Sequence, residues 1–312
     1  MSEFKFNPSK WAPFDDQAVC ERVRRVKKED LTKHSNPDLN IEIMKDADMP
    51  FYRVWDIFLR IKEAYEENRK FVVILPQPHP QYEKVAYLIN KFKIPCKHLY
   101  TFNMDEWADQ DGNIAPETYK KGFMYAQMHN FYYNIDEKLR PPIEQIQGPT
   151  NKNIKDYDKM IEDLGGADLA DCGIGWSGHI AFIDPGTEEF SGSFEEWKQM
   201  GPRLVTLNPF TIAQSSLDSD FGLSGDWAAV PPRAATIGPA QVLNAKLYNS
   251  WNRFTISPTP VSWERFSVRL ALHGPVTQKV TGSLLQIRKK TNVYISDILA
   301  QDISDDAALS WY

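Results

Sequence analysis

The sequence has few cysteines and no long apolar run. Only 3 of its 312 residues are cysteine, and Cys20, Cys96 and Cys172 lack the paired spacing of a zinc site or a disulfide framework. This usage indicates free thiols in a reducing compartment. No run of about 18 apolar residues occurs, and the first residues contain no apolar segment followed by a cleavage site. We therefore expect a cytoplasmic protein that has no membrane partner.

The chain also lacks the concentrated basic face that a nucleic-acid-binding protein needs to neutralise phosphates. Its formal net charge is -6, and its isoelectric point is about 5.6. Two short basic clusters, at 22–28 and 288–290, fit solvated helix faces or strand ends. Hydrophobic residues make up 42% and charged residues 25%, which excludes a disordered or fibrous class and predicts a globular protein without a nucleic-acid partner.

Apolar runs alternate with amphipathic segments along the chain. The run at 71–75 is continuously apolar, as is typical of a strand covered on both faces. A helix is expected before it, because Asp48 can cap a segment in which Pro50 suits the first turn. The same patterns predict further strands at 98–102, before Gly173, at 253–257 and at 292–296, and helices at 83–92, 118–133, 154–164, 241–245 and 261–272.

This alternation predicts an α/β fold with three αβα layers around a mostly parallel, Rossmann-like sheet. No repeat or linker divides the chain, so we expect a single domain over 41–312. An N-terminal extension over 1–40 precedes it, with at most one short helix near 17–28. Ligands of such sheets bind at the carboxyl ends of strands, where the segments 76–82, 103–106 and 173–186 lie.

The turn at 173–185 reads Gly-Ile-Gly-Trp-Ser-Gly-His-Ile-Ala-Phe-Ile-Asp-Pro. Gly175 and Gly178 belong to a G-x-G-x-x-G pattern, which also occurs in dinucleotide-binding proteins. That pattern should open a helix, whereas Pro185 stops the segment here, so we disfavour nicotinamide binding. His179 changes its protonation most easily near neutral pH, which makes this turn the predicted centre of the chemistry.

A second polar turn follows the strand that ends at Phe102. It reads Asn-Met-Asp-Glu and places the carboxylates of Asp105 and Glu106 side by side. An isolated Asp-Glu pair is usually a solvated strand end or a helix cap. In a parallel sheet, however, a carboxylate and a histidine from two strand ends can converge on one ligand as base and acid. We therefore predict that Asp105 and His179 share a site.

Together, the Asn-Met-Asp-Glu element and the long Gly-His turn resemble the glucosamine-6-phosphate deaminase (isomerase) family. The resemblance runs from about residue 40 to the C-terminus and includes the Val-Pro segment at 230–238. Related sugar-lactone hydrolases share the Gly-His turn, but the element around Asp105 fits the deaminases better. The resemblance implies an enzyme for the aldose–ketose isomerisation of an amino sugar or its phosphate with ammonia release. It implies no metal and no organic cofactor, and a homo-oligomer is one expectation.

The resemblance also assigns roles to residues. His179 would open the sugar ring, and Asp105 would move a proton between C2 and C1 of the open chain. Asp184 stands where the family has a glutamate and would orient the imidazole. The predicted substrate-binding residues are Gln77, His79, Glu106, Gly175, Ser177, Gly178 and Arg203.

Two departures from the family pattern change the expectation. Ser177 stands where the family has an aspartate, which predicts a less firmly charged imidazole and altered ring opening. The loop at 75–81 reads Leu-Pro-Gln-Pro-His-Pro-Gln, and its prolines remove N–H donors that a phosphate loop needs. Three functions stay open: the deaminase/isomerase, an isomerase or deaminase of a different or non-phosphorylated sugar, and a catalytically impaired, sugar-binding regulatory homologue. Trp107 and Trp176 are equally open between sugar stacking and core packing.

Overall fold

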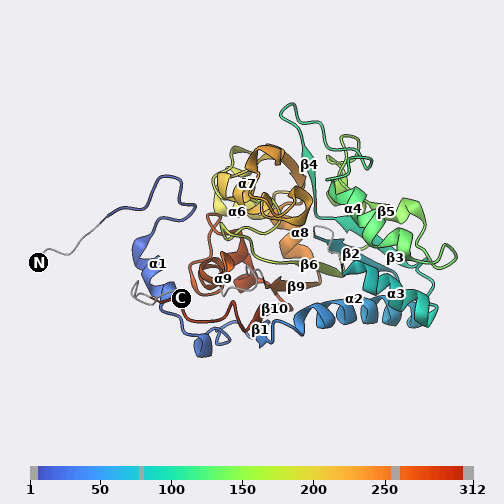
Figure 1. Cartoon of the computed structure of the whole chain (residues 1–312), viewed down its shortest axis with the longest axis horizontal. Helices are drawn as coiled ribbons and strands as arrows, with labels where there is room; N and C mark the ends of the chain where they lie inside the picture. Colours follow the sequence, from blue (N-terminus) through green and yellow to red (C-terminus); the bar gives the residue numbers. More distant parts are fainter. Residues whose placement is uncertain (1–5, 77–80, 254–260, 305–312) are drawn as a thin grey trace, which may run out of the picture.

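The computed structural model describes residues 6–76, 81–253 and 261–304. In these ranges a seven-stranded parallel sheet forms the centre of the molecule (Figure 1). The predicted α/β class with a mostly parallel sheet is confirmed. In spatial order the strands are β1 (Leu39–Met44), β10 (Thr291–Ser296), β9 (Leu247–Asn252), β6 (Leu169–Cys172), β2 (Phe71–Leu75), β3 (Leu99–Asn103) and β5 (Ile146–Gln147).

The side chains of β2 alternate between two hydrophobic cores. Phe71, Val73 and Leu75 pack on one face of the sheet with helices α2 (Met49–Glu66) and α3 (Tyr82–Phe92). Val72 and Ile74 point to the other face and join a second core. All five side chains are at most 2% exposed, which explains why this strand is apolar at every position.

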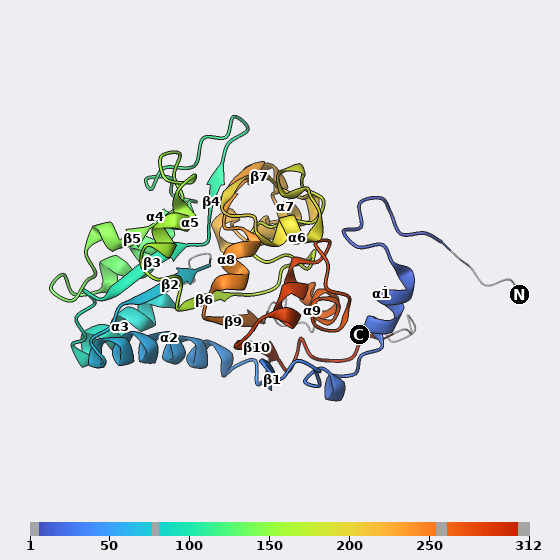
Figure 2. The ribbon, with the colours of Figure 1, turned by 180° about the vertical axis from the view of Figure 1, so that it is seen from behind.

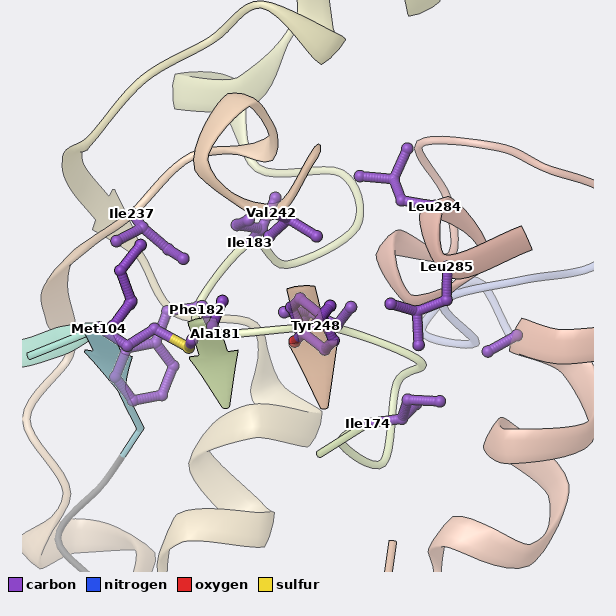
Figure 3. Close-up of a cluster of buried hydrophobic side chains, with 14 of the residues drawn as sticks. Met104, Ile174, Ala181, Phe182, Ile183, Ile237, Val242, Tyr248, Leu284 and Leu285 are labelled. Atoms are coloured by element: carbon purple, nitrogen blue, oxygen red, sulfur yellow. The ribbon is translucent and has the colours of Figure 1, made fainter. Parts of the chain in front are cut away.

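The second core lies on the other face of the sheet and includes the turn at 173–185. Figure 3 shows part of it, with Ile174, Ala181, Phe182 and Ile183 of the turn gathered around Tyr248. The turn is therefore packed into the interior. The helices that contribute buried side chains to this core include α5 (Tyr157–Glu162), α8 (Pro239–Asn244), α9 (Glu264–His273) and the 3-10 segment η7 (Thr281–Ile287).

A small antiparallel sheet extends beyond the carboxyl end of β3. Figures 1 and 2 show it on one side of the large sheet, together with the short helices α6 and α7. Asp105 pairs with Thr236, and Thr236 pairs with Arg203 on the third strand. The elements are β4 (Asp105–Ala108), β8 (Arg233–Thr236), β7 (Arg203–Thr206), α6 (Phe194–Lys198) and α7 (Pro209–Ser215).

One strand was not predicted from the pattern, and one predicted helix is too long. The strand that was not predicted is β9 (Leu247–Asn252). Of the strand predicted at 253–257, Arg253 lies outside any strand, and 254–257 lie outside the described residues. The apolar pattern did not predict β9 because this strand buries two asparagines. The amide of Asn249 donates to Asp56, and that of Asn252 donates to the carbonyl of Tyr294. The helix placed at 118–133 is α4 (Phe123–Asn130), which begins after Gly122.

The N-terminal segment packs against the domain. It contains α1 (Gln17–Arg24), near the predicted position, and α1 contacts α9. Val23 and Leu31 are fully buried, and Arg269 donates a hydrogen bond to the carbonyl of Val26. A domain boundary at residue 40 stays a prediction. None of the helices in the described ranges is long and apolar enough to cross a bilayer.

Candidate active site

Asp105 is joined directly to the turn that carries His179. Asp105 begins β4 and is 5% exposed. Its Oδ1 accepts a hydrogen bond from the N–H of Phe182 at 3.3 Å. The same N–H lies 3.1 Å from Oγ1 of Thr236. Since Phe182 is three residues from His179, this bond brings the two sequence motifs to one place at the carboxyl edge of the sheet.

Burial raises the pKa of Asp105 to about 7, because removal from water disfavours the charged carboxylate. The hydroxyl of Thr236, the N–H of Phe182 and the nearby His179 each lower this pKa and oppose the effect of burial. A carboxyl group with this pKa gains and loses a proton readily near neutral pH, as a proton shuttle must.

The backbone at Ala181 directs the N–H of Phe182 towards Asp105. Ala181 has a φ of 54°, a left-handed conformation that is uncommon for residues other than glycine. Such strained residues persist only where the surrounding structure holds them, and they cluster at functional sites. Ala181 is buried in the second core, which supplies that support.

His179 is 6% exposed, and three oxygen atoms surround Nδ1 of its imidazole. Oγ of Ser177 lies at 2.8 Å, Oδ1 of Asp184 at 3.2 Å and Oγ1 of Thr211 at 3.3 Å. Thr211 also donates its hydroxyl hydrogen to Oδ1 of Asp184 at 2.6 Å. The N–H of Asn208 donates to the other oxygen of Asp184 at 2.9 Å.

These partners determine which nitrogen of His179 carries the proton. A carboxylate only accepts, and the hydroxyl hydrogen of Thr211 points to Asp184, so both groups need a hydrogen on Nδ1. Nε2 of the neutral ring then carries the lone pair. This is the nitrogen that can take a proton from a ligand.

Two glycines of the turn are required by close contacts. A Cβ atom at Gly175 would lie 2.1 Å from Nε2 of His179, so any side chain there would displace the imidazole. Gly178 has a φ of 80°, and its carbonyl accepts the N–H of Gly282. Gly175 also donates its N–H to the carbonyl of His179 at 2.9 Å. The contacts shown by the structure give both glycines a role in shaping the turn.

Glu106 contacts the first turn of α4. Its oxygens accept the N–H groups of Trp107 and Phe123 at 2.9 and 3.0 Å, and that of Met124 at 2.8 Å. Burial raises the pKa of Glu106 to about 7, while these N–H donors lower it. Glu106 thus stabilises the N-terminus of α4. Its contact with substrate stays a prediction.

The remaining predicted residues either bond to groups other than Asp105, His179 and Asp184 or lie outside the described ranges. Arg203 is half-buried, and its guanidinium donates to the carbonyls of Glu189 and Gly201 at 2.6 and 3.1 Å. Gln77 and His79 lie outside the described residues. In the described part of the chain, no group of three or more His, Cys, Asp or Glu side chains is placed to hold a metal ion.

The two tryptophans of the motifs differ in their surroundings. Trp107 is fully buried and packs with aromatic rings that include Phe182, so it belongs to the core. Trp176 is half-buried, and its ring stacks on Trp263 at 5.6 Å between centroids. The ring of Trp176 thus packs on another aromatic side chain, as the ring of Trp107 does.

Sequence reasoning missed the two threonines that support the site. Thr236 lies within the Val-Pro segment at 230–238, so the resemblance pointed to its neighbourhood without assigning it a role. Thr211 lies on α7, and the sequence around it carries no comparable signal. Thr236 and Thr211 belong to the site through their contacts with Asp105 and His179.

A buried carboxyl group and an oriented histidine at the carboxyl edge of a parallel sheet define an α/β enzyme of the acid–base type. No family model matches the chain. The glucosamine-6-phosphate deaminase of Caenorhabditis elegans is 32% identical over 197 residues, which are 61% of this chain and 66% of that protein. The corresponding protein of Dictyostelium discoideum is 30% identical over 200 residues, 62% of this chain and 67% of the relative.

Solved structures agree on the fold. A monomeric glucosamine-6-phosphate deaminase described as a missing link of the NagB superfamily has a TM-score of 0.63 at 20% identity, covering 84% of this chain and 98% of that one. The 6-phosphogluconolactonase from Trypanosoma cruzi has a TM-score of 0.58 at 13% identity, covering 88% and 99%. The chain belongs to the glucosamine-6-phosphate deaminase family and is a deaminase/isomerase-like enzyme.

Proposed function

We propose that this protein converts an amino sugar of the glucosamine 6-phosphate type into a ketose and releases ammonia. The observation that carries this proposal is the hydrogen bond from Phe182 to Asp105. It sets a carboxyl group with a pKa of about 7 beside the turn of the oriented His179. Two proton-transfer groups with different environments are what a ring opening followed by an isomerisation needs.

In the proposed reaction, Nε2 of His179 takes the proton of the anomeric hydroxyl and returns a proton to the ring oxygen, which gives the open-chain aldehyde. Asp105 then removes the proton from C2 while the aldehyde oxygen takes a proton from the ammonium group on C2, which gives an enolamine. Asp105 next delivers the proton it took from C2 to C1. The nitrogen on C2 becomes an imine, and water adds to this carbon and displaces ammonia to leave the ketose. Asp184 and Ser177 hold the imidazole through Nδ1 during the first stage.

A specific observation also supports a sugar that lacks the 6-phosphate or carries its charge elsewhere. Arg203, one of the predicted substrate-binding residues, directs its guanidinium to main-chain carbonyls. Position 205 is valine where the family has lysine, and the loop at 75–81 is rich in proline. Phosphate recognition normally combines several charge-assisted hydrogen bonds, so this second candidate substrate class is tested beside the first.

The third possibility, an impaired sugar-binding homologue, rests on Ser177. The hydroxyl of Ser177 contacts Nδ1 at 2.8 Å, so a hydrogen bond occupies this place although the negative charge of the family aspartate is absent. The geometry therefore favours an active enzyme over a binder.

One assay separates the three functions. Ammonia and ketose are measured with glucosamine 6-phosphate and with glucosamine, using His179→Gln as the inactive control. Turnover of the phosphate ester alone supports the first function, and turnover of the free sugar alone supports the second. Thermal stabilisation by either sugar without turnover supports the binder and contradicts the proposed catalysis.

We further propose a cytoplasmic location and a homo-oligomer. The free thiols of Cys20, Cys96 and Cys172 support the location, and burial raises the pKa of Cys96 to about 12, which suits an unreactive structural thiol. Light scattering on the purified chain tests the oligomer, since a monomer mass at working concentration contradicts it.

A further inference from the structure

Helix α7 contacts both the carboxylate and the imidazole of the site. The N–H of Asn208, at the start of α7, donates to one oxygen of Asp184, and the hydroxyl of Thr211 donates to the other. Thr211 is 1% exposed, and its Oγ1 lies 3.3 Å from Nδ1 of His179. Thr211 is thus a shared neighbour of the two residues whose alignment the ring opening needs.

The rest of α7 is fixed to the same turn at two further points. Gln214 accepts the N–H of Trp176 at 2.7 Å through its side-chain oxygen, and the ring of Phe210 meets that of Trp176 edge to face at 5.7 Å between centroids. Because α7 and the turn contact each other on both sides of Thr211, the hydroxyl has a fixed position relative to the imidazole.

We infer that Thr211 is a positioning residue, which keeps the proton of neutral His179 on Nδ1 and leaves the lone pair on Nε2. Its hydrogen is used by Asp184, so its oxygen can only accept from Nδ1. Ser177 cannot impose this direction, because a hydroxyl that is free to rotate donates or accepts equally well. Asp184 also needs a hydrogen on Nδ1, and the hydroxyl of Thr211 holds its Oδ1 beside that nitrogen. Thr211→Val therefore removes one acceptor of Nδ1 and releases the other. Only the contribution of Thr211 to catalysis depends on the proposed function. The inference about the imidazole itself does not.

The direct test is nuclear magnetic resonance of the whole 312-residue chain labelled with ¹⁵N in its histidine rings, with His179→Gln used to assign the signal. The two nitrogens of a neutral ring give distinct shifts, so the protonated one is read without a substrate. We expect the Nδ1–H form in the wild type, a mixture of both forms in Thr211→Val, and recovery of the wild-type form in Thr211→Ser. A matched control is Thr206→Val, which removes a hydroxyl bonded to Glu189 away from the site.

An Nε2–H form in the wild type overturns the inference even if no variant folds. An unchanged Nδ1–H form in Thr211→Val also overturns it. If a substrate is turned over, Thr211→Val should lower kcat about tenfold or more with little change in KM, because misaligned groups slow the chemical step. If no sugar is turned over, the proposed function fails while the ring signal still decides the role of Thr211.

Discussion

The main-chain N–H of Phe182 donates a hydrogen bond to Oδ1 of Asp105 across 77 positions of the sequence. This contact joins the end of one strand to the turn after another. It also stabilises the charged form of a carboxyl group that burial makes hard to ionise. The reactivity of Asp105 therefore depends on the conformation of the turn that carries His179.

Replacing Asp105 by asparagine should abolish the isomerisation and stabilise the fold at alkaline pH. The pKa of about 7 in the folded protein lies above the ordinary aspartate value of 3.8. Asp105 therefore favours folding fully below about pH 4, and this contribution is lost as the pH rises to 7. Asp105→Asn should gain on the order of 4 kcal/mol over the wild type between pH 4 and pH 8. Urea unfolding at both values measures this, and an equal difference at the two pH values contradicts it.

Thr236 should set the pH range of activity. Its hydroxyl lowers the pKa of Asp105, so Thr236→Val should raise this pKa further above 7. Less carboxylate is then present at a given pH, and the acidic limb of kcat/KM should move upward by about one pH unit. Thr236→Ser keeps the hydroxyl and should retain the wild-type profile. A profile that does not move in the valine variant would show that another group controls the limb.

An alanine at Gly175 should remove activity and leave the fold in place. Its Cβ would overlap Nε2 of His179, so the imidazole must rotate away from its partners. We expect kcat to fall at least a hundredfold. Gly148→Ala is the matched control, because the three atoms nearest to its Cβ would all belong to the flexible side chain of Met124, the nearest at 3.3 Å. Equal activity of both variants would mean that the position of His179 is not critical.

Glu106 should contribute to stability more than to substrate binding. Its loss in Glu106→Ala leaves the N–H groups of Phe123 and Met124 without their acceptor. The free energy of unfolding should fall by about 2 kcal/mol. Glu106→Gln keeps one oxygen and should lose less. A tenfold rise in KM for Glu106→Gln without loss of stability would instead support the predicted contact with substrate.

The large sheet was predictable where strands are buried on both faces. The run at 71–75 is apolar throughout, and the observed β2 has the same bounds. The apolar pattern did not predict β9, because Asn249 and Asn252 are buried there and donate hydrogen bonds to residues of other elements. A sequence cannot show that such polar groups will be satisfied, since their partners lie far away in the chain.

The site was predictable for residues within motifs and not for those that support them. Asp105, His179 and Asp184 stand in recognisable local patterns, and the structure brings them together. Thr236 reaches the site because β8 pairs with β4, and Thr211 reaches it because α7 begins beside Asp184. Glu106 stands in the same motif as Asp105, yet it contacts the start of α4.

The sequence alone determined the α/β class and the residue types that carry the chemistry, because both follow from periodicity and short-range order along the chain. Tertiary structure alone decided that Asp105 has a pKa of about 7 and that His179 presents Nε2. Both properties come from burial and from hydrogen bonds between distant segments, and these exist only once the sheets have formed.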